Sequence, residues 1–337
     1  HVVPRAPSGW WVEHFDIHII REPEQALALL PADPARCAVL GEANSTLGGF
    51  APDNPAPVID HLHWHRSFKT PYEIALMRHA QVPAVRAHRA AEAAFRAGAS
   101  EFEIHMAYCA AAGQDANELP YGNIIALNEN GAVLHYTELD KQRPANPRSF
   151  LIDAGASAHG YASDITRTFP VSGRFSPEQK AIYELVLASQ EAAFKEIAPG
   201  KHWNEAHEAT VRVITAGLVE LGLLSGDVDE LIASEAYKPF YMHRAGHWLG
   251  MDVHDVGDYK VGGQWRVLEP GMAMTVEPGI YIAPDNDKVA KKWRGIGVRI
   301  EDDVVVTKKG CEILTGGVPK TVAEIEALMA AARAEAA

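Results

Sequence analysis

Two phrases near the C-terminal end of the chain, TVEPGIY at 275–281 and GVRIED at 297–302, each place a glutamate at the end of an apolar run typical of a strand. A Pro-Gly pair turns the chain directly after Glu277, which fixes its carboxylate at the strand end. Arg299 is two positions from Glu301 and therefore on the same face of a strand. A cation there would orient a ligand carboxylate from behind.

Two aspartate phrases lie upstream, LIDAGA at 151–156 and YASDITRTF at 161–169. They carry Asp153 and Asp164, which are 11 residues apart. Two strands this close in sequence pair readily in a hairpin, so both carboxylates can point into one cavity. Gly155 permits a bulge or a close approach of the backbone.

A histidine phrase, HRAGHWLGMDVHD at 243–255, lies between the two acidic pairs. It contains His243, His247 and His254. A spacing of four suits one face of a helix, but glycines surround the middle histidine. We therefore expect a glycine-rich loop or strand rather than a helix.

Asp153, Asp164, His247, Glu277 and Glu301 together offer four hard oxygen donors and one imidazole. Each of these acids alone would more often be a solvated surface carboxylate. Buried together, they must be paired with cations or must coordinate metal. Two divalent ions would neutralise their charge, so the residue types predict a two-metal hydrolytic site.

The overall charge narrows the classes of partner. The chain has 337 residues, 47% apolar and 22% charged, which is ordinary for a globular enzyme. Its formal net charge of −13 argues against nucleic acid or an anionic membrane as a partner. We see neither a run of 18 apolar residues nor a signal-peptide pattern.

Cysteine usage bears on the compartment. Cys37, Cys109 and Cys311 are far apart, odd in number and show no metal-ligand spacing. We interpret them as reduced thiols and expect a cytoplasmic protein.

Periodicity predicts mixed helices and strands from about residue 66 onward. Capping boxes at 70–73 and 176–179 predict helices that run to about residue 96, with a kink or interruption at Pro83, and to about residue 198. Further helices are expected at 101–112, at 204–221 and from about 322. Strands are expected at 123–128, 132–136, 149–155, 165–171, 273–282 and 297–307.

The first part of the chain predicts a small α/β domain. Residues 9–20 alternate and 37–42 are apolar, which indicates strands, and 23–30 has helical spacing. We therefore expect two domains, 1–64 and 65–337. The chain starts at His1, and about 65 residues are few for such a domain, so we expect part of it to be missing.

The five phrases, in this order, resemble the pita-bread metallopeptidases, a family that includes methionine aminopeptidase, aminopeptidase P and prolidase. The resemblance covers roughly residues 60–335. It implies an α+β pita-bread catalytic domain behind a small α/β N-terminal domain. It also implies two divalent ions per subunit, Mn²⁺ first with Co²⁺ and Zn²⁺ as alternatives, and a homodimer. The implied metal ligands are Asp153, Asp164, His247, Glu277 and Glu301.

The resemblance also assigns roles around the metals. A hydroxide bridging the ions would attack the scissile carbonyl, and Glu277 would pass its proton to the leaving nitrogen. His243 and His254 would steady the substrate and the oxyanion. His135 resembles a substrate-facing histidine, and Arg299 and Tyr281 are expected beside the ligands.

The substrate class is indicated by two parts of the sequence. Residues 58–140 look like bacterial prolidase, the Xaa-Pro dipeptidase, whereas 247–257 and 277–303 look more like aminopeptidase P. Related prolidases carry an arginine for the dipeptide's carboxylate in an insertion between the two glutamates. This chain is short there, with 24 positions from Glu277 to Glu301. Arg244, which replaces a glycine, is the candidate anchor.

Tyr237 and Tyr241 are candidate helpers of that anchor. The expected activity is therefore hydrolysis of Xaa-Pro dipeptides, with short proline-containing peptides as the partners. The alternative is an aminopeptidase P that releases the first residue of Xaa-Pro-Yaa peptides. A weaker alternative is a non-catalytic binding module on the same fold.

Overall fold

The structure is a computed structural model and describes residues 7–335, without the side chains of residue 23 and of residues 331–335. The chain divides into two compact units, His1–His63 and Trp64–Ala337. Within the described residues, the helices are all too short or too polar to cross a membrane.

The first unit consists of short elements. They are η1 (Trp10–His14), α1 (Pro23–Leu27), η2 (Pro34–Arg36) and most of α2 (Ala56–Arg66). The strands predicted at 9–20 and 37–42 are wrong, whereas the helix predicted after residue 23 is confirmed over a shorter range. Alternation produces a strand only where a partner strand accepts its hydrogen bonds, and the described residues supply none here. Trp10 accordingly remains 79% exposed.

The second unit opens with two helices that pack on an antiparallel sheet. The helices are α3 (Pro71–Arg96) and α4 (Glu101–Ala112), and the sheet has the order β1 (Ile124–Leu127), β2 (Ser149–Asp153), β5 (Thr166–Pro170). Thr70 and Glu73 form the predicted capping box. The helix is continuous through Pro83, so this proline removes one backbone hydrogen bond without ending the helix.

A second set of helices and strands completes the unit. The helices are α5 (Pro177–Lys195), α6 (Trp203–Glu220), α7 (Val228–Ala233) and α8 (Val322–Glu335). The strands are β6 (Lys260–Val261), β7 (Gln264–Trp265), β8 (Ala273–Val276), β9 (Gly279–Tyr281), β10 (Gly297–Arg299), β11 (Asp302–Val306) and β12 (Cys311–Ile313). They form a sheet of order β12-β11-β8 and the pairs β10-β9 and β6-β7.

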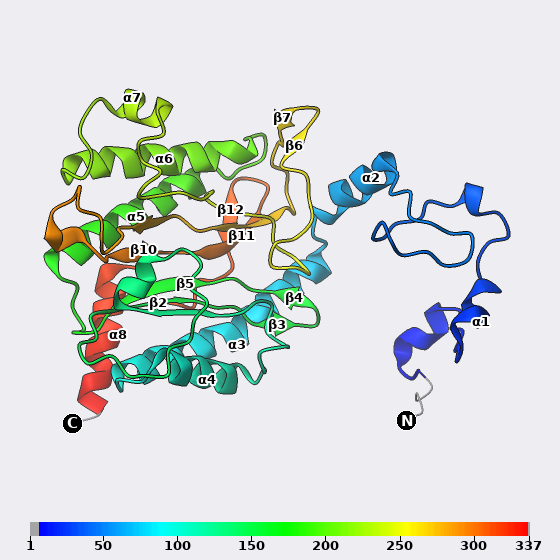
Figure 1. The fold of residues 1–337 in the computed structure, drawn as a ribbon, viewed down its shortest axis with the longest axis horizontal. Coiled ribbons are helices and arrows are strands. Elements are labelled where there is room, and N and C mark those ends of the chain that lie inside the picture. The colour runs from blue at the N-terminus through cyan, green and yellow to red at the C-terminus, as the bar shows by residue number, and fades with distance from the viewer. Residues whose placement is uncertain (1–6, 336–337) are drawn as a thin grey trace. The chain divides into compact units, whose positions relative to one another are not determined.

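The strands β2, β5, β10 and β11 lie between two helix pairs, with α3 and α4 on one side and α5 and α6 on the other (Figure 1). The first set of helices and strands, up to β5, and the second set, from α5 onward, form two halves of this unit. A bridge between Thr166 and Glu301 joins them. The remaining hairpin, β3 (Ser157–Ala158) with β4 (Tyr161–Ala162), lies in the connection from β2 to β5. The strand predicted at 132–136 is wrong, because a 3-10 turn, η3 (Asn128–Ala132), ends the ladder that β1 begins.

Arg167 stabilises the junction of the two halves from inside the core. Its guanidinium is fully buried and donates to Asp302 Oδ1 at 2.7 Å and to the carbonyl of Glu301 at 2.6 Å. Lys320 donates to the other oxygen of Asp302 at 2.6 Å. Burial opposes ionisation of Asp302, yet these two cations hold its pKa below the usual range.

Arg167→Met is therefore expected to lower the free energy of unfolding by about 3 kcal/mol, because it leaves a buried carboxylate with one cation fewer. Urea denaturation of the purified variant measures this. The control is Arg148→Met, whose pair with Glu129 is exposed and should contribute less than about 1 kcal/mol. Similar losses for both variants would contradict the role of the buried pair.

Candidate metal centre

The two aspartates are brought together by the first sheet. Asp153 is the last residue of β2 and lies opposite Thr166 of β5. Asp164 lies in the segment between β4 and β5. The hydroxyl of Tyr121 lies 2.8 Å from Asp153 Oδ1 and 2.5 Å from Asp164 Oδ1. The expected pairing of the strands is confirmed, and Tyr121, which sequence reasoning missed, holds both carboxylates.

The connection between the aspartates depends on a close backbone approach. A Cβ on Gly155 would lie 1.9 Å from the carbonyl oxygen of Ser163, so only glycine fits there. The backbone N–H of Asp164 donates to Asp303 Oδ2 at 3.0 Å, and Gln81 donates to the same oxygen at 2.8 Å. Asp303 thus fixes the backbone of a candidate ligand.

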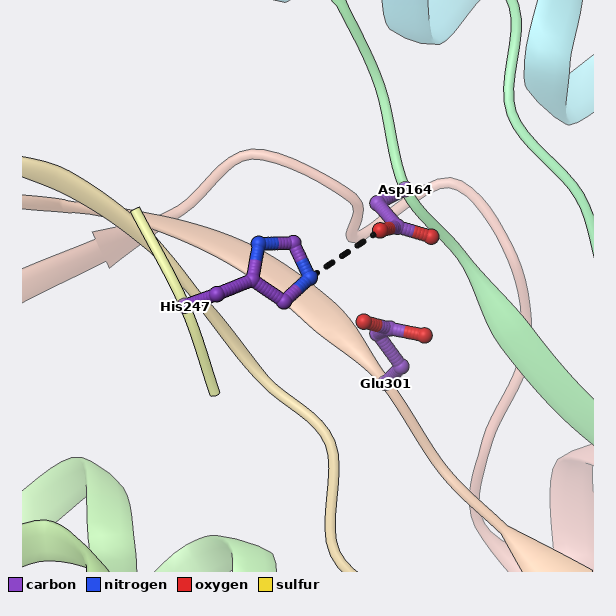
Figure 2. Close-up of side chains that lie close together, drawn as sticks. All are labelled: Asp164, His247 and Glu301. Carbon is purple, nitrogen blue, oxygen red and sulfur yellow. Dashed lines mark ion pairs between the residues drawn. The ribbon is translucent and has the colours of Figure 1, made fainter. Parts of the chain in front are cut away.

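His247 lies on a non-helical, glycine-rich segment, as expected. Its backbone N–H donates to Thr275 Oγ1 at 3.1 Å, and a Cβ on neighbouring Gly246 would lie 2.0 Å from the carbonyl oxygen of Thr275. The ring Nδ1 lies 2.9 Å from the carbonyl oxygen of Trp248, which assigns the proton to Nδ1. Nε2 therefore faces the cavity, 3.4 Å from Asp164 Oδ2 (Figure 2).

The glutamates enter from the second half of the unit. Glu277 follows β8, and its backbone N–H donates to the carbonyl of Ala245 at 2.8 Å. Its Oε1 lies 3.6 Å from His247 Nε2. Glu301 lies between β10 and β11, and its Oε2 accepts a hydrogen bond from Thr166 Oγ1 at 2.6 Å.

One atom each from Asp164, His247 and Glu301 lies within 4.8 Å of the others, and all three residues are buried (Figure 2). Asp153 and Glu277 line the same cavity, which has a volume of about 430 Å³. The structure therefore brings all the predicted metal ligands to one place.

The electrostatics of this cluster require positive charge. Burial and neighbouring carboxylates raise the pKa of Glu301 well above its usual value, and burial raises the pKa of Asp164. Burial likewise raises the pKa of Glu277 to about 7. Burial alone would lower the pKa of His247, but Asp164 and Glu277 outweigh it and raise it to about 9.

Divalent ions fit this donor set. Three carboxylates that resist ionisation without a counter-charge lie beside an imidazole whose Nε2 faces the cavity, and hard oxygen and imidazole donors suit Mn²⁺, Co²⁺ and Zn²⁺. Asp153, Asp164, His247, Glu277 and Glu301 are the residues that would hold such ions. Water coordinated there would become a nucleophile near neutral pH.

Arg299 supplies the fixed positive charge at one edge of the cluster. It is buried and donates to Asp153 Oδ2 at 2.8 Å, to the hydroxyl of Tyr281 at 3.0 Å and to Thr166 Oγ1 at 3.2 Å. The hydroxyl of Tyr281 in turn lies 2.9 Å from Nε2 of His243. Arg299 and Tyr281 thus orient a candidate ligand and a candidate substrate histidine.

The candidate histidines all line the cavity. His243 Nδ1 lies 2.8 Å from the carbonyl oxygen of Arg244 and 3.7 Å from Glu277 Oε2. Burial and the charge of Arg299 lower the pKa of His243 to about 3, so this ring is neutral. The ring of His254 lies against that of His247, with centroids 4.2 Å apart. His135 lines the cavity from the irregular segment after η3.

Of the candidate carboxylate anchor and its two candidate helpers, only the anchor lines this cavity. Arg244 lines it, and its guanidinium lies 5.1 Å from the ring centre of Trp265. Tyr237 and Tyr241 do not line this cavity. Both line a smaller neighbouring cavity, together with Arg244.

Comparison with protein families divides the chain at about the same place as its compact units. The family described as "Metallopeptidase family M24" matches residues 75–308, and "Xaa-Pro dipeptidase, N-terminal domain" matches residues 1–64. The first match covers all the candidate ligands.

Curated relatives match along nearly the whole chain. A protein named Xaa-Pro dipeptidase from Stenotrophomonas maltophilia K279a is 51% identical over 94% of this chain and 77% of its own length. A protein of the same name from Xanthomonas euvesicatoria is 50% identical over 94% and 78%.

Solved structures match most of the chain. Pseudomonas aeruginosa aminopeptidase PepP is 65% identical over 82% of this chain, with a TM-score of 0.77, and the match spans 63% of that protein. Escherichia coli aminopeptidase P is 46% identical over 85% of this chain and 64% of its own, with a TM-score of 0.77. These likenesses confirm the predicted α+β pita-bread fold.

The family match runs through both halves of the second unit. The curated relative from Stenotrophomonas maltophilia is 51% identical over 94% of the chain. The geometry of the cavity agrees with that match, because every predicted ligand lines it. The chain belongs to metallopeptidase family M24.

Proposed function

We propose that the protein hydrolyses the peptide bond before proline in Xaa-Pro dipeptides, with divalent ions held by Asp153, Asp164, His247, Glu277 and Glu301. The observation that carries this proposal is the convergence of these side chains on one cavity of about 430 Å³. The names of the half-identical relatives and of the family matching residues 1–64 support the dipeptide substrate.

An aminopeptidase P activity on Xaa-Pro-Yaa peptides is the second candidate. It is favoured by the 65% identity to Pseudomonas aeruginosa aminopeptidase PepP, which exceeds the 51% identity to the first of the dipeptidases. Both candidates use the same centre and differ only in the group on the C-terminal side of the proline, a free carboxylate or a further residue.

The ions, when bound, would polarise the scissile carbonyl and lower the pKa of the attacking water. The description of Escherichia coli aminopeptidase P with zinc in complex with product supports a divalent ion of this kind. We propose Mn²⁺ as the native ion, with Co²⁺ and Zn²⁺ as alternatives.

Glu277 is the proposed proton carrier. Its carboxylate faces the cavity between His247 and His243, at 3.6 and 3.7 Å. In this position it accepts the proton of the attacking water and delivers it to the leaving nitrogen of proline, a tertiary amide that must be protonated to depart.

The histidines then act on the substrate. His243 uses both ring nitrogens within the protein, toward the carbonyl of Arg244 and the hydroxyl of Tyr281, so it forms a fixed wall. His254, which lines the cavity, is the better placed donor to the developing oxyanion. His135 completes the substrate side of the cavity.

Arg244 is the proposed partner of the dipeptide's carboxylate, because it lines the cavity and pairs with no carboxylate among the described residues. A charge-assisted hydrogen bond contributes roughly 1.5–3 kcal/mol. Arg244→Ala is therefore expected to raise KM for Ala-Pro by about 10–100-fold and to affect Ala-Pro amide much less. Steady-state kinetics on both substrates measure this.

The matched control is Lys260→Ala, which removes the other cation of the Trp265 ring, 4.3 Å from its centre, without changing the cavity wall. It should leave both KM values within about twofold. Equal effects of Arg244→Ala on the free and the amidated peptide would mean that Arg244 only supports its loop.

A further inference from the structure

A second cavity, of about 170 Å³, lies beside the one lined by the candidate metal ligands. The two cavities share His243 and Arg244 in their walls. The rest of the small cavity's wall is formed by His207 from α6 and by the chain segment that leads to the histidine phrase. The residues of that segment are Glu235, Tyr237, Lys238, Tyr241 and Met242.

Two buried polar atoms of residues that line this small cavity lack a hydrogen-bond partner among the described residues. They are the hydroxyl of Tyr241, a residue that is 0% exposed, and Nδ1 of His207. The two rings lie 5.9 Å apart. Buried polar groups are nearly always paired, so two unpaired groups around one cavity indicate that a polar ligand or water belongs between them.

The charged side chains that line the small cavity favour an anionic ligand. Lys238 pairs with Glu235 at 2.6 Å, which leaves Arg244 as the cation without a carboxylate among the described lining residues. Burial and the charges of Arg244 and Lys238 lower the pKa of His207 to about 4. The ring is therefore neutral at physiological pH and keeps one N–H to donate.

The small cavity is within reach of the reacting bond. His243 Nδ1 lies 3.7 Å from Glu277 Oε2, and the ring of Tyr241 lies 4.9 Å from the ring of His243. A peptide held at the metal centre needs to extend past one histidine to place its far end beside Tyr241. A single peptide could therefore be cleaved at the metal centre while its far end lies in the small cavity.

We propose that the small cavity binds the C-terminal carboxylate of the peptide substrate. The hydroxyl of Tyr241 and an N–H of His207 donate to it, and Arg244 supplies the opposite charge. This inference rests on the proposed function. It goes beyond it by assigning a place to the free carboxylate and a role to His207, which no sequence pattern indicated.

The test is Tyr241→Phe, which removes one oxygen and keeps the ring. Kinetics are measured with metal-loaded protein on Ala-Pro, Ala-Pro-Ala and the amide of each. KM is expected to rise about tenfold for a free peptide, while kcat and the KM of its amide stay within about twofold. The length at which the effect occurs identifies the peptide whose carboxylate reaches the cavity.

Two further variants sharpen the test. His207→Leu should shift the same free-acid KM by about threefold or more and spare the amide. Tyr108→Phe is the matched control, because Tyr108 is also 0% exposed with an unpaired hydroxyl but lies outside this cavity. It should change neither substrate.

The outcomes are distinct. Unchanged KM for both free peptides in Tyr241→Phe, or equal changes for free acid and amide, would overturn the inference and mean that water fills the cavity. Cleavage of the amides by all variants would leave the proposed function standing in that case. Failure of the unmodified protein to cleave any of these substrates would instead overturn the proposed function.

Discussion

Glu277→Gln is expected to lower kcat for Xaa-Pro hydrolysis by at least about 10³-fold. The carboxylate lies 3.6 Å from His247 Nε2 and faces the cavity, where it serves both as a ligand and as the proton carrier. An amide keeps the shape but neither accepts a proton nor neutralises a cation. Both roles are lost together, so the effect should fall on kcat more than on KM.

The matched control is Glu92→Gln, because Glu92 is also buried but pairs with Arg96 on α3 and does not line the cavity. It should retain activity within a few-fold even if stability falls. A folded Glu277→Gln protein with activity within tenfold of the parent would contradict the role of Glu277 as ligand and proton carrier.

Removal of divalent ions is expected to reduce turnover to background, and added Mn²⁺ or Co²⁺ should restore it. Without ions, burial raises the pKa values of Glu277, Asp164 and Glu301, so the cluster takes up protons in place of metal. The ions bind where the carboxylates can ionise, and affinity should therefore weaken as the pH falls.

The measurement combines exhaustive dialysis against a chelator, metal analysis and turnover of Ala-Pro before and after addition of each ion. Mg²⁺ and Ca²⁺ serve as comparison ions, since an imidazole ligand favours transition metals over them. Full activity in a preparation shown to hold no metal would rule the mechanism out.

The catalytic part of the fold was largely predictable from the sequence. Capping boxes at 70–73 and 176–179 mark the starts of α3 and α5, because the side chains that satisfy the first turn lie within the motif itself. The strand that ends at Asp153 and the strand that directly precedes Glu277 were predictable because continuous apolar runs become buried strands.

The wrong strands fail for a common reason. Segments 9–20 and 132–136 have strand-like patterns, but a strand also needs a partner with free hydrogen-bonding groups. In the described residues, neither segment has one. Pairing is a property of the tertiary structure, and the local pattern does not contain it.

The site likewise contains residues that the local sequence identifies and residues that only the tertiary structure brings into place. Asp153, Asp164, His247, Glu277 and Glu301 each stand in a phrase of their own, and their chemistry identifies them before any geometry is known. Residues that act through contact alone were missed. Tyr121 precedes β1, whose register places Ile124 opposite Asp153, so only the pairing of β1 with β2 brings the hydroxyl to both aspartates.

His207 and the role of Tyr241 escaped prediction for a similar reason. His207 is a single histidine on a helix, and a lone histidine is more often a satisfied polar residue than a functional one. Only the packing of α6 against the segment before His243 places its ring beside Tyr241. The unpaired atoms, and not the residue types, are the signal.

The most direct test of the central claim is turnover of an Xaa-Pro dipeptide and an Xaa-Pro-Yaa tripeptide by metal-stripped protein, as Mn²⁺ is added back. The proposed function predicts that cleavage before proline appears with added Mn²⁺, rises as up to two ions bind per chain, and is faster for the dipeptide. Faster cleavage of the tripeptide would move the protein to the aminopeptidase P activity. No cleavage of either peptide at full metal occupancy would contradict the account.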